Sequence, residues 1–133
     1  MSTWSLDEWE SKANAEKRLV TYQLHITLQQ MQQACVGCLA EFLFPAGNYL
    51  YTGSARRNLP ARVHRHLAPQ KKQRWHIDYL LMAPKARVTA VGLFSEAECY
   101  CNQQVSGEIL LAGFGASDCR AQCGSHLKYL GDQ

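Results

Sequence analysis

Residues 48–66 read NYLYTGSARRNLPARVHRH, a pattern that predicts a strand, a tight turn and a basic helix in succession. Side chains alternate between the two faces of a strand, so Tyr49 and Tyr51 are expected on the same face. Gly53 and the small residues after it allow the backbone to turn sharply into the helix. A turn placed between a strand and a helix is a position where a functional site can be built.

The helix after this turn has a start signal and one apolar face. Asn58 can cap it, and Pro60 falls in its first turn, where a missing N–H costs little. Arg62 and His66 lie one helical turn apart, so both can lean over the strand toward the tyrosines. Apolar side chains recur every four positions and predict a buried stripe, formed by Leu59, Val63 and Leu67.

Length and composition indicate one domain. A chain of 133 residues can bury a core of its own, and nothing in the sequence indicates a second core. Residues 1–18 are polar and are expected to form an N-terminal arm or a loosely attached helix, which leaves residues 19–133 as the folded domain. No segment approaches the roughly 18 apolar residues of a membrane span, so we expect a cytoplasmic protein without membrane contact. In that compartment the six cysteines are expected to be free thiols or metal ligands.

Charge is distributed unevenly, although the net charge is only +3. No acidic residue occurs between Phe42 and Ile77, whereas half of the 14 Lys and Arg residues lie there. A solvated helix face usually carries charges of both signs, so this pattern favours a surface that faces a polyanion, above all nucleic acid. The residues expected to bind it are Arg56, Arg57, Arg65, Lys71, Lys72, Arg74 and His76.

Three further segments have the pattern of strands. Residues 18–28 alternate in polarity and predict the first core strand. Residues 29–33 are expected to be a polar connection, and residues 35–44 to be one extended segment that leads into the strand at Tyr49. Residues 87–94 predict the next strand.

Two helices complete the predicted elements. Residues 75–81 suit a short helix, and Ser95 opens a longer one that is expected to run to about Leu110. Ser95 and Glu98 have the spacing of a capping box. The sequence therefore predicts an α+β domain with a small mixed or antiparallel central sheet, flanked by helices.

The cysteines offer two candidate clusters. Cys35 and Cys38 have CxxC spacing, but residues three apart on an extended segment point to opposite faces, which argues against a metal or redox site. Near the C-terminus, two cysteines and a histidine fall within eight residues, and Cys99 or Cys101 can add a fourth ligand. A structural zinc site would then comprise Cys99, Cys119, Cys123 and His126. The alternative, which the sequence favours, is that the cysteines are small buried hydrophobes and that the histidine caps a turn.

With these residues in place, the chain resembles the GIY-YIG nuclease superfamily. Val20-Thr21-Tyr22 stands where the first tripeptide would be, with valine in place of its glycine, and Tyr51-Thr52-Gly53 stands at the second. Arg62 and Arg65-His66 follow on the next helix. Other stretches resemble a poorly characterised prokaryotic subgroup that is sometimes fused to an endonuclease III type of repair enzyme: Phe44-Pro45-Ala46-Gly47, Trp75-His76-Ile77-Asp78-Tyr79, Glu98-Cys99, Gly115-Ala116-Ser117-Asp118-Cys119 and Ser125-His126-Leu127. The resemblance covers about residues 19–130.

The resemblance implies a metal-dependent endonuclease that hydrolyses phosphodiester bonds, with DNA favoured over RNA and with a role in DNA repair or processing. Tyr22 and Tyr51 would orient or deprotonate the attacking water. Arg62 would bind the phosphate, and His66 would assist in proton transfer. These are the catalytic residues that the resemblance indicates.

A carboxylate is also needed to hold the divalent ion, Mg²⁺ or Mn²⁺. Glu98 is the first candidate, although its position in a capping box would explain it without a metal, and Asp78 is the second. An alternative function stays open at this point: a non-catalytic module that keeps the nuclease fold and only binds nucleic acid.

Overall fold

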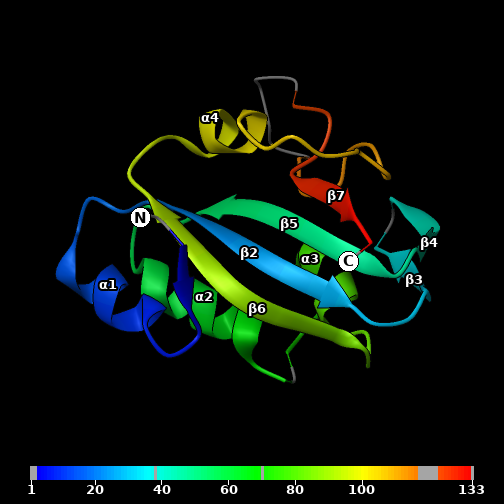
Figure 1. Cartoon of the computed structure of the whole chain (residues 1–133), viewed down its shortest axis with the longest axis horizontal. Coiled ribbons are helices and arrows are strands. Elements are labelled where there is room, and N and C mark those ends of the chain that lie inside the picture. The colour runs from blue at the N-terminus through cyan, green and yellow to red at the C-terminus, as the bar shows by residue number, and fades with distance from the viewer. Residues whose placement is uncertain (1–2, 38, 70, 117–122, 133) are drawn as a thin grey trace.

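A computed structural model gives the structure of residues 3–37, 39–69, 71–116 and 123–132 (Figure 1). Its elements follow in this order: β1 (Thr3–Ser5), α1 (Trp9–Ala15), β2 (Thr21–Leu28), β3 (Gln32–Val36), β4 (Ala40–Phe44), β5 (Gly47–Ser54), α2 (Leu59–Leu67), α3 (His76–Leu81), β6 (Ala86–Phe94), α4 (Glu98–Gln103) and β7 (Leu127–Gly131). None of the helices in these ranges is long and apolar enough to cross a membrane.

An antiparallel sheet with helices packed against it forms the architecture. Five strands make the main sheet in the order β1-β6-β2-β5-β7, and β3 pairs with β4 in a separate two-stranded sheet. In Figure 1, α2 and α3 lie behind the strands, and α4 lies beyond β5 near the top of the view. The predicted α+β class, with an antiparallel sheet flanked by helices, is confirmed.

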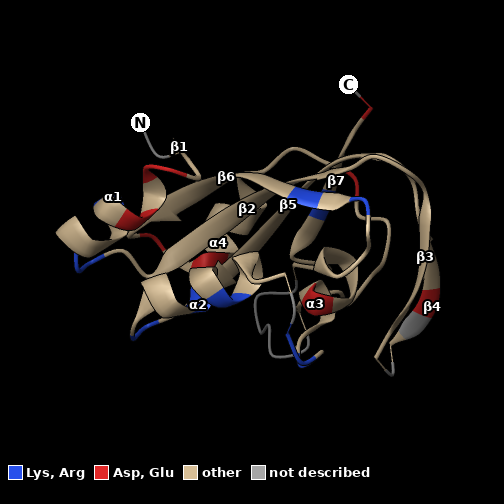
Figure 2. Cartoon of the chain, turned by 90° about the horizontal axis from the view of Figure 1, so that it is seen from below, with Lys and Arg blue, Asp and Glu red and all other residues tan. Residues whose placement is uncertain are grey.

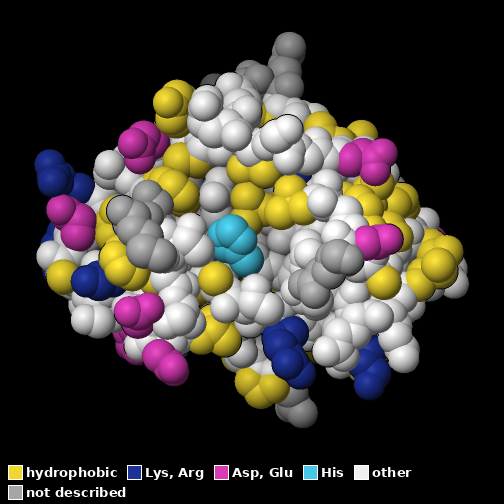
Figure 3. Space-filling model, viewed as in Figure 1, with side chains coloured by type: hydrophobic (Ala, Val, Ile, Leu, Met, Phe, Trp, Pro, Cys, Tyr) yellow, Lys and Arg dark blue, Asp and Glu magenta, His cyan; other side chains and the backbone are white. Residues whose placement is uncertain are grey.

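The two faces of β2 have different surroundings. Leu24 belongs to the buried core together with Val63 of α2, and both side chains are 0% exposed. Gln23 lies on the opposite face, where its Nε2 donates to the backbone oxygen of Cys101 in α4 at 3.3 Å. His25 is on that second face too, and Figure 3 shows that the face is hollowed in the middle, with a histidine visible in the hollow. Helices therefore cover one face fully and the other only near α4.

The pairing of β2 with β5 places the two predicted tyrosines together. Tyr22 is opposite Gly53, and Leu24 is opposite Tyr51, so both tyrosines lie on the same face of neighbouring strands, as expected. The Tyr22 ring lies across Gly53, because a Cβ added at residue 53 would be 2.5 Å from Cζ and from Oη of Tyr22. A glycine is needed at this position because the Tyr22 ring occupies the space of a Cβ.

The extended segment expected at residues 35–44 is in fact a hairpin, which is a correction. β3 begins at Gln32, inside the expected polar connection, and pairs with β4 in a register that joins Gln32 to Phe44 and Val36 to Ala40. Gly37 has a φ of +53°, a left-handed conformation that lets the chain reverse. Cys35 is exposed on β3, and Cys38 lies outside the described residues.

The helix expected from Ser95 to about Leu110 is much shorter, and its predicted capping box is wrong. α4 spans only Glu98–Gln103, its N-cap is Ala97, and no side chain caps it. Ser95 is exposed, and the Glu98 carboxylate bonds to side chains elsewhere in the fold. After α4, Glu108 forms a bridge with Tyr129 of β7, so the chain returns to the sheet edge instead of continuing as a helix.

The segment before residue 19, which was expected to form an N-terminal arm or a loosely attached helix, contributes residues to the main sheet and to the buried core. β1 adds an edge strand to the sheet by pairing with β6 at Gly92, Val91 and Ala90. Trp9 at the start of α1 is only 2% exposed and contacts the ring of His64 in α2, with centroids 4.9 Å apart. The sheet and the buried cluster therefore extend across the expected boundary at residue 18.

We predict that only one of the two expected helix caps contributes to stability. Asn58 has a φ of 54° and its side chain accepts from the Ala61 N–H, so Asn58→Ala loses a cap and leaves an alanine in a left-handed conformation. The free energy of unfolding should fall by about 1–2 kcal/mol. Ser95→Ala should leave it within about 0.5 kcal/mol of the wild-type value, because Ser95 is exposed and caps nothing. Urea denaturation of both variants measures this, and a loss for Ser95→Ala as large as for Asn58→Ala would contradict the assignment of the caps.

Candidate active site

A buried hydrogen bond joins the first predicted tyrosine to the helix histidine. Tyr22 Oη lies 2.7 Å from Nε2 of His66, and the two residues are 1% and 2% exposed. Burial lowers the pKa of His66 to about 4, so the imidazole is neutral at pH 7. In the tautomer with its proton on Nδ1, the neutral ring accepts the hydrogen bond that the Tyr22 hydroxyl donates. The pair is therefore arranged for passing a proton from the tyrosine to the histidine.

Tyr51 stands beside this pair on the same face of the sheet. Its ring centroid is 6.1 Å from that of His66 and 6.4 Å from that of Phe114. Gly115 packs closely against it, since a Cβ there would be 2.9 Å from Cε1 of Tyr51. The Tyr51 side chain is buried, with 7% of the residue exposed, and among the described residues none forms a side-chain hydrogen bond with its hydroxyl.

Burial raises the pKa of both tyrosine hydroxyls well above the ordinary value of a phenol. For Tyr22, the positive charge of Arg62 opposes this increase, whereas the negative charge of Glu98 adds to it. Both tyrosines are therefore neutral in the resting protein. Each can pass or orient a proton, but neither is a preformed tyrosinate.

Arg62 is held from two sides. Its Nη1 donates to the backbone oxygen of Ser54 at 3.2 Å, and its guanidinium lies 4.5 Å from the centroid of the Trp75 ring. The guanidinium of Arg65 lies over the same indole at 4.2 Å. Such cation–π contacts and a backbone acceptor restrict the side chain while leaving its other donors for a ligand. Trp75 was not among the predicted site residues, because an indole just before a helix has no distinctive sequence signal.

Glu98 reaches the end of β5 from the first turn of α4. One carboxylate oxygen accepts from Ser54 Oγ at 2.6 Å, and the other lies 2.5 Å from Nδ1 of His126. Burial alone would raise the pKa of Glu98, but the hydrogen bonds from His126 and Ser54 hold the pKa below its usual value. The side chain is 26% exposed, and each oxygen keeps a further lone pair. An ionised, partly exposed carboxylate of this kind fits a hard divalent ion, which typically takes one or two carboxylates together with water.

Asp78, the second metal candidate, has a different role. It is 0% exposed and accepts from both terminal nitrogens of Arg65 at 2.9 Å, and also from the backbone N–H groups of Arg74 and Trp75 at 2.9 Å. These four hydrogen bonds occupy its oxygens and fix the start of α3. Burial opposes ionisation, but the bonds from Arg65 and the two N–H groups hold the pKa of Asp78 below its usual value. Asp78 therefore positions Arg65 and Trp75 beneath the site.

The predicted basic surface is only partly free to meet a ligand. Arg65 is ion-paired with Asp78, and His76 points inward, with its Nδ1 accepting from the Gly115 N–H at 2.8 Å. The other members remain at the surface, with Lys71 half-buried and Arg56, Arg57, Lys72 and Arg74 exposed. Figure 2 shows these cations on the turn before α2 and between α2 and α3, with the acidic residue of α3 beside them. The sequence analysis did not predict the two ion pairs that the fold forms in this region, Glu10 with His64 and Asp78 with Arg65.

Three of the four residues in the predicted zinc set lie together. The ligand atoms of Cys99, Cys123 and His126 are all within 4.8 Å of one another. Cys119, the fourth, lies outside the described residues. His126 thus contacts Glu98 through one ring nitrogen and this cluster through the other.

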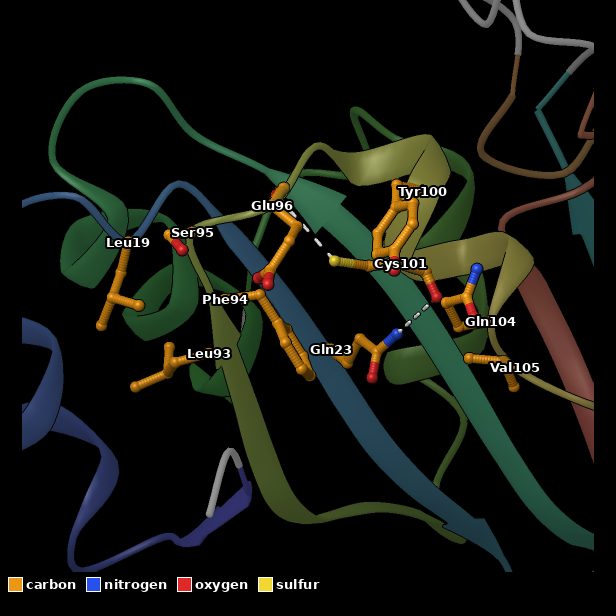
Figure 4. Close-up of a pocket in the computed structure, with 10 residues that line it drawn as sticks. All are labelled: Leu19, Gln23, Leu93, Phe94, Ser95, Glu96, Tyr100, Cys101, Gln104 and Val105. Carbon is orange, nitrogen blue, oxygen red and sulfur yellow. Dashed lines mark hydrogen bonds between the residues drawn. The ribbon is translucent and has the colours of Figure 1, made fainter.

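An open pocket of about 540 Å³ lies along α4 and the ends of β2 and β6. Figure 4 shows its lining, with Gln23 donating to the Cys101 oxygen and the Cys101 thiol directed toward the Glu96 oxygen. Its lining contains none of the predicted site residues, and comprises Leu19, Gln23, Leu93, Phe94, Ser95, Glu96, Tyr100, Cys101, Gln104 and Val105. The candidate active site is therefore the group around Tyr22 and not this pocket.

Comparisons with known proteins give a family for most of the chain. A family model described as domain of unknown function DUF123 matches residues 21–133. Searches of curated proteins and of solved structures found no significant match. The matched range includes each of the site residues described above.

The buried neutral histidine predicts how stability depends on pH. The pKa of His66 falls from 6.5 to about 4 on folding, so between these values the unfolded chain binds more protons than the folded protein. Stability should therefore be fully present above pH 6.5 and should be lost as the pH falls toward 4, by on the order of 3 kcal/mol from this group. Urea denaturation between these two pH values measures the loss.

His66→Gln should flatten this pH dependence, because glutamine keeps an acceptor for Tyr22 but does not titrate. His64→Gln is the matched control, since His64 lies on the same helix and is exposed. Equal pH dependence in the two variants would show that His66 is not the titrating group.

Proposed function

The chain belongs to the DUF123 domain family, and we propose that it is a metal-dependent endonuclease of the GIY-YIG type that hydrolyses phosphodiester bonds in nucleic acid. One observation carries the proposal: four elements, spread over residues 21–103, bring the required groups to one end of β5. These groups are Tyr22 from β2, Tyr51 from β5, Arg62 and His66 from α2, and Glu98 from α4. Phosphodiester hydrolysis needs a proton acceptor for water, a cation for the developing charge and a carboxylate for a divalent ion.

Tyr22 and His66 supply the proton path. The neutral Tyr22 hydroxyl accepts a proton from the attacking water while its own proton passes to Nε2 of His66 across the 2.7 Å hydrogen bond. The Tyr51 hydroxyl, which no described residue engages, orients the same water. Because burial keeps both phenols neutral, proton transfer accompanies the attack and does not precede it.

Arg62 stabilises the negative charge that develops on the phosphoryl oxygens. The Ser54 carbonyl and the Trp75 ring hold its guanidinium before substrate binds, so little reorganisation is needed during the reaction. The same arrangement restricts which of its N–H groups face the substrate. In this proposal Arg62 acts as a preorganised phosphate ligand.

Glu98 would hold Mg²⁺ or Mn²⁺, which when bound supplies Lewis acidity at the phosphate. Ser54 orients the carboxylate by a hydrogen bond of 2.6 Å, and Nδ1 of His126 lies 2.5 Å from the other carboxylate oxygen. The lowered pKa keeps Glu98 ionised at neutral pH, so it is ready to act as a ligand.

The exposed cations Arg56, Arg57 and Lys72 would hold the phosphate backbone of the substrate. The resemblance to a subgroup found fused to repair enzymes favours DNA as the substrate, and repair or processing as the setting.

Two substitutions separate catalysis from binding. Arg62→Ala should lower the cleavage rate about a hundredfold or more, roughly 3 kcal/mol of transition-state stabilisation, with only a small loss of affinity. Glu98→Gln should also abolish most of the activity while the chain stays folded, with partial rescue by higher Mg²⁺ or Mn²⁺. The assay offers single-stranded, duplex, branched and abasic DNA, and structured RNA, and measures single-turnover rates and affinity in parallel.

Matched controls exist for both variants. Arg87→Ala removes an arginine at the other end of the sheet, opposite Thr27, and Glu96→Gln removes an exposed carboxylate two residues before Glu98. Both should cut at the wild-type rate. Cleavage by Arg62→Ala at full rate would place the catalytic centre elsewhere, and wild-type protein that binds tightly but cuts nothing would establish the alternative function, a non-catalytic nucleic-acid-binding module.

The exposed cations predict salt-dependent binding with little sequence preference. Binding that neutralises phosphates weakens as salt increases, and each lost contact should reduce the slope of log K against log salt by about one unit. Replacing Lys71, Lys72 and Arg74 with alanine should therefore weaken binding to all sequences and flatten the slope between roughly 50 and 200 mM salt. Fluorescence anisotropy with unrelated oligonucleotides measures both. A triple variant with the wild-type affinity and slope would remove this surface from the proposal.

A further inference from the structure

Two cysteines and a histidine meet between α4 and the segment that leads into β7. Cys99 is the second residue of α4, whereas Cys123 and His126 precede β7. Cys99 Sγ lies 3.8 Å from Nε2 of His126, and the three ligand atoms are all within 4.8 Å of one another. In a tetrahedral zinc site, Zn–S bonds of about 2.3 Å and Zn–N bonds of about 2.0 Å place sulfur and nitrogen about 3.5 Å apart. The separation of Cys99 and His126 is therefore close to that of two ligands of one ion.

The surroundings of His126 fix it in position. Its backbone oxygen accepts from the Thr52 N–H at 3.0 Å, and its backbone N–H donates to the Phe114 oxygen at 2.9 Å. The residue is only 2% exposed. The imidazole therefore faces Cys99 from a backbone that is anchored to both β5 and the preceding loop.

Glu98 supplies the outer partner that metal-binding histidines usually have. Its carboxylate lies 2.5 Å from Nδ1 of His126, so the other ring nitrogen, Nε2, is the one that faces the cysteines. A carboxylate that accepts from one nitrogen fixes the tautomer and leaves the second nitrogen with a lone pair for the metal. Gln103 adds a similar contact, since its amide donates to Cys123 Sγ at 3.5 Å and would stabilise a thiolate.

We propose that Cys99, Cys123 and His126 bind a zinc ion, with Glu98 as the residue that positions His126. Thiolate and imidazole ligands select Zn²⁺ over the hard Mg²⁺ expected on the carboxylate itself, so the two metals do not compete for the same donors. The ion would also join α4, a helix of six residues without a side-chain cap, to the strand segment beside it. Where the proposed nuclease function holds as well, the zinc site orients the carboxylate that the reaction needs.

Metal content tests this without any nucleic acid. Wild-type protein purified under reducing conditions should contain one zinc ion per chain, as measured by elemental mass spectrometry of the purified protein. After chelation, added Co²⁺ should give thiolate-to-cobalt charge-transfer absorption and the intense visible bands of a tetrahedral site. Cys99→Ser and Cys123→Ser should each lower the charge-transfer intensity and weaken the affinity for zinc at least tenfold, and Glu98→Gln should weaken it by about ten- to a hundredfold.

Two other cysteines provide matched controls. Cys101 lies on the same helix as Cys99 but points toward the Glu96 oxygen, and Cys35 is exposed on β3. Cys101→Ser and Cys35→Ser should keep full zinc content and an unchanged cobalt spectrum.

A wild-type protein that is folded by circular dichroism but takes up no Co²⁺ into a thiolate site would overturn the proposal. A Cys123→Ser variant with wild-type zinc affinity, or a Cys99–Cys123 disulfide in place of the metal, would do the same. Cleavage activity does not enter these measurements, so failure of the nuclease proposal would leave them unaffected.

Discussion

The contact between Tyr22 and His66 sets the geometry on which the rest of the site depends. It requires β2 to pair with β5 in a single register, because a shift by one residue would turn Tyr22 to the opposite face. It also requires α2 to approach that face with His66 inward. This orientation carries Arg62, one turn earlier on the same helix, to the Ser54 carbonyl at the end of β5. Sheet register and helix orientation thus determine which polar groups meet.

Ser54 links the two halves of the site. Its backbone oxygen accepts from Arg62, and its hydroxyl donates to Glu98 at 2.6 Å. One residue at the end of β5 therefore orients both the cation and the carboxylate. The Glu98–His126 contact extends this chain of polar contacts to the cysteine cluster, so the arginine, the carboxylate and the cluster are connected through adjacent side chains.

The sequence predicted those features that depend on local pattern. Alternation identified β2 and β5, and the capping signal at Asn58 with the four-residue apolar spacing identified α2. The pattern failed where a distant contact decided the outcome. α4 stops early because the chain returns to pair with Tyr129, and the helix signal at residues 104–110 carries no information about that strand. The roles of Ser54, Trp75 and Asp78 were also missed, because each depends on partners that only the folded chain brings close.

Gly53 couples the stability of the protein to the chemistry of the site. The Tyr22 ring occupies the space that any larger residue at position 53 would need, and the same ring carries the hydroxyl that bonds to His66. A substitution there must either move the ring or push β2 away from β5. Any replacement of this glycine would therefore need compensating changes in both strands to restore the site.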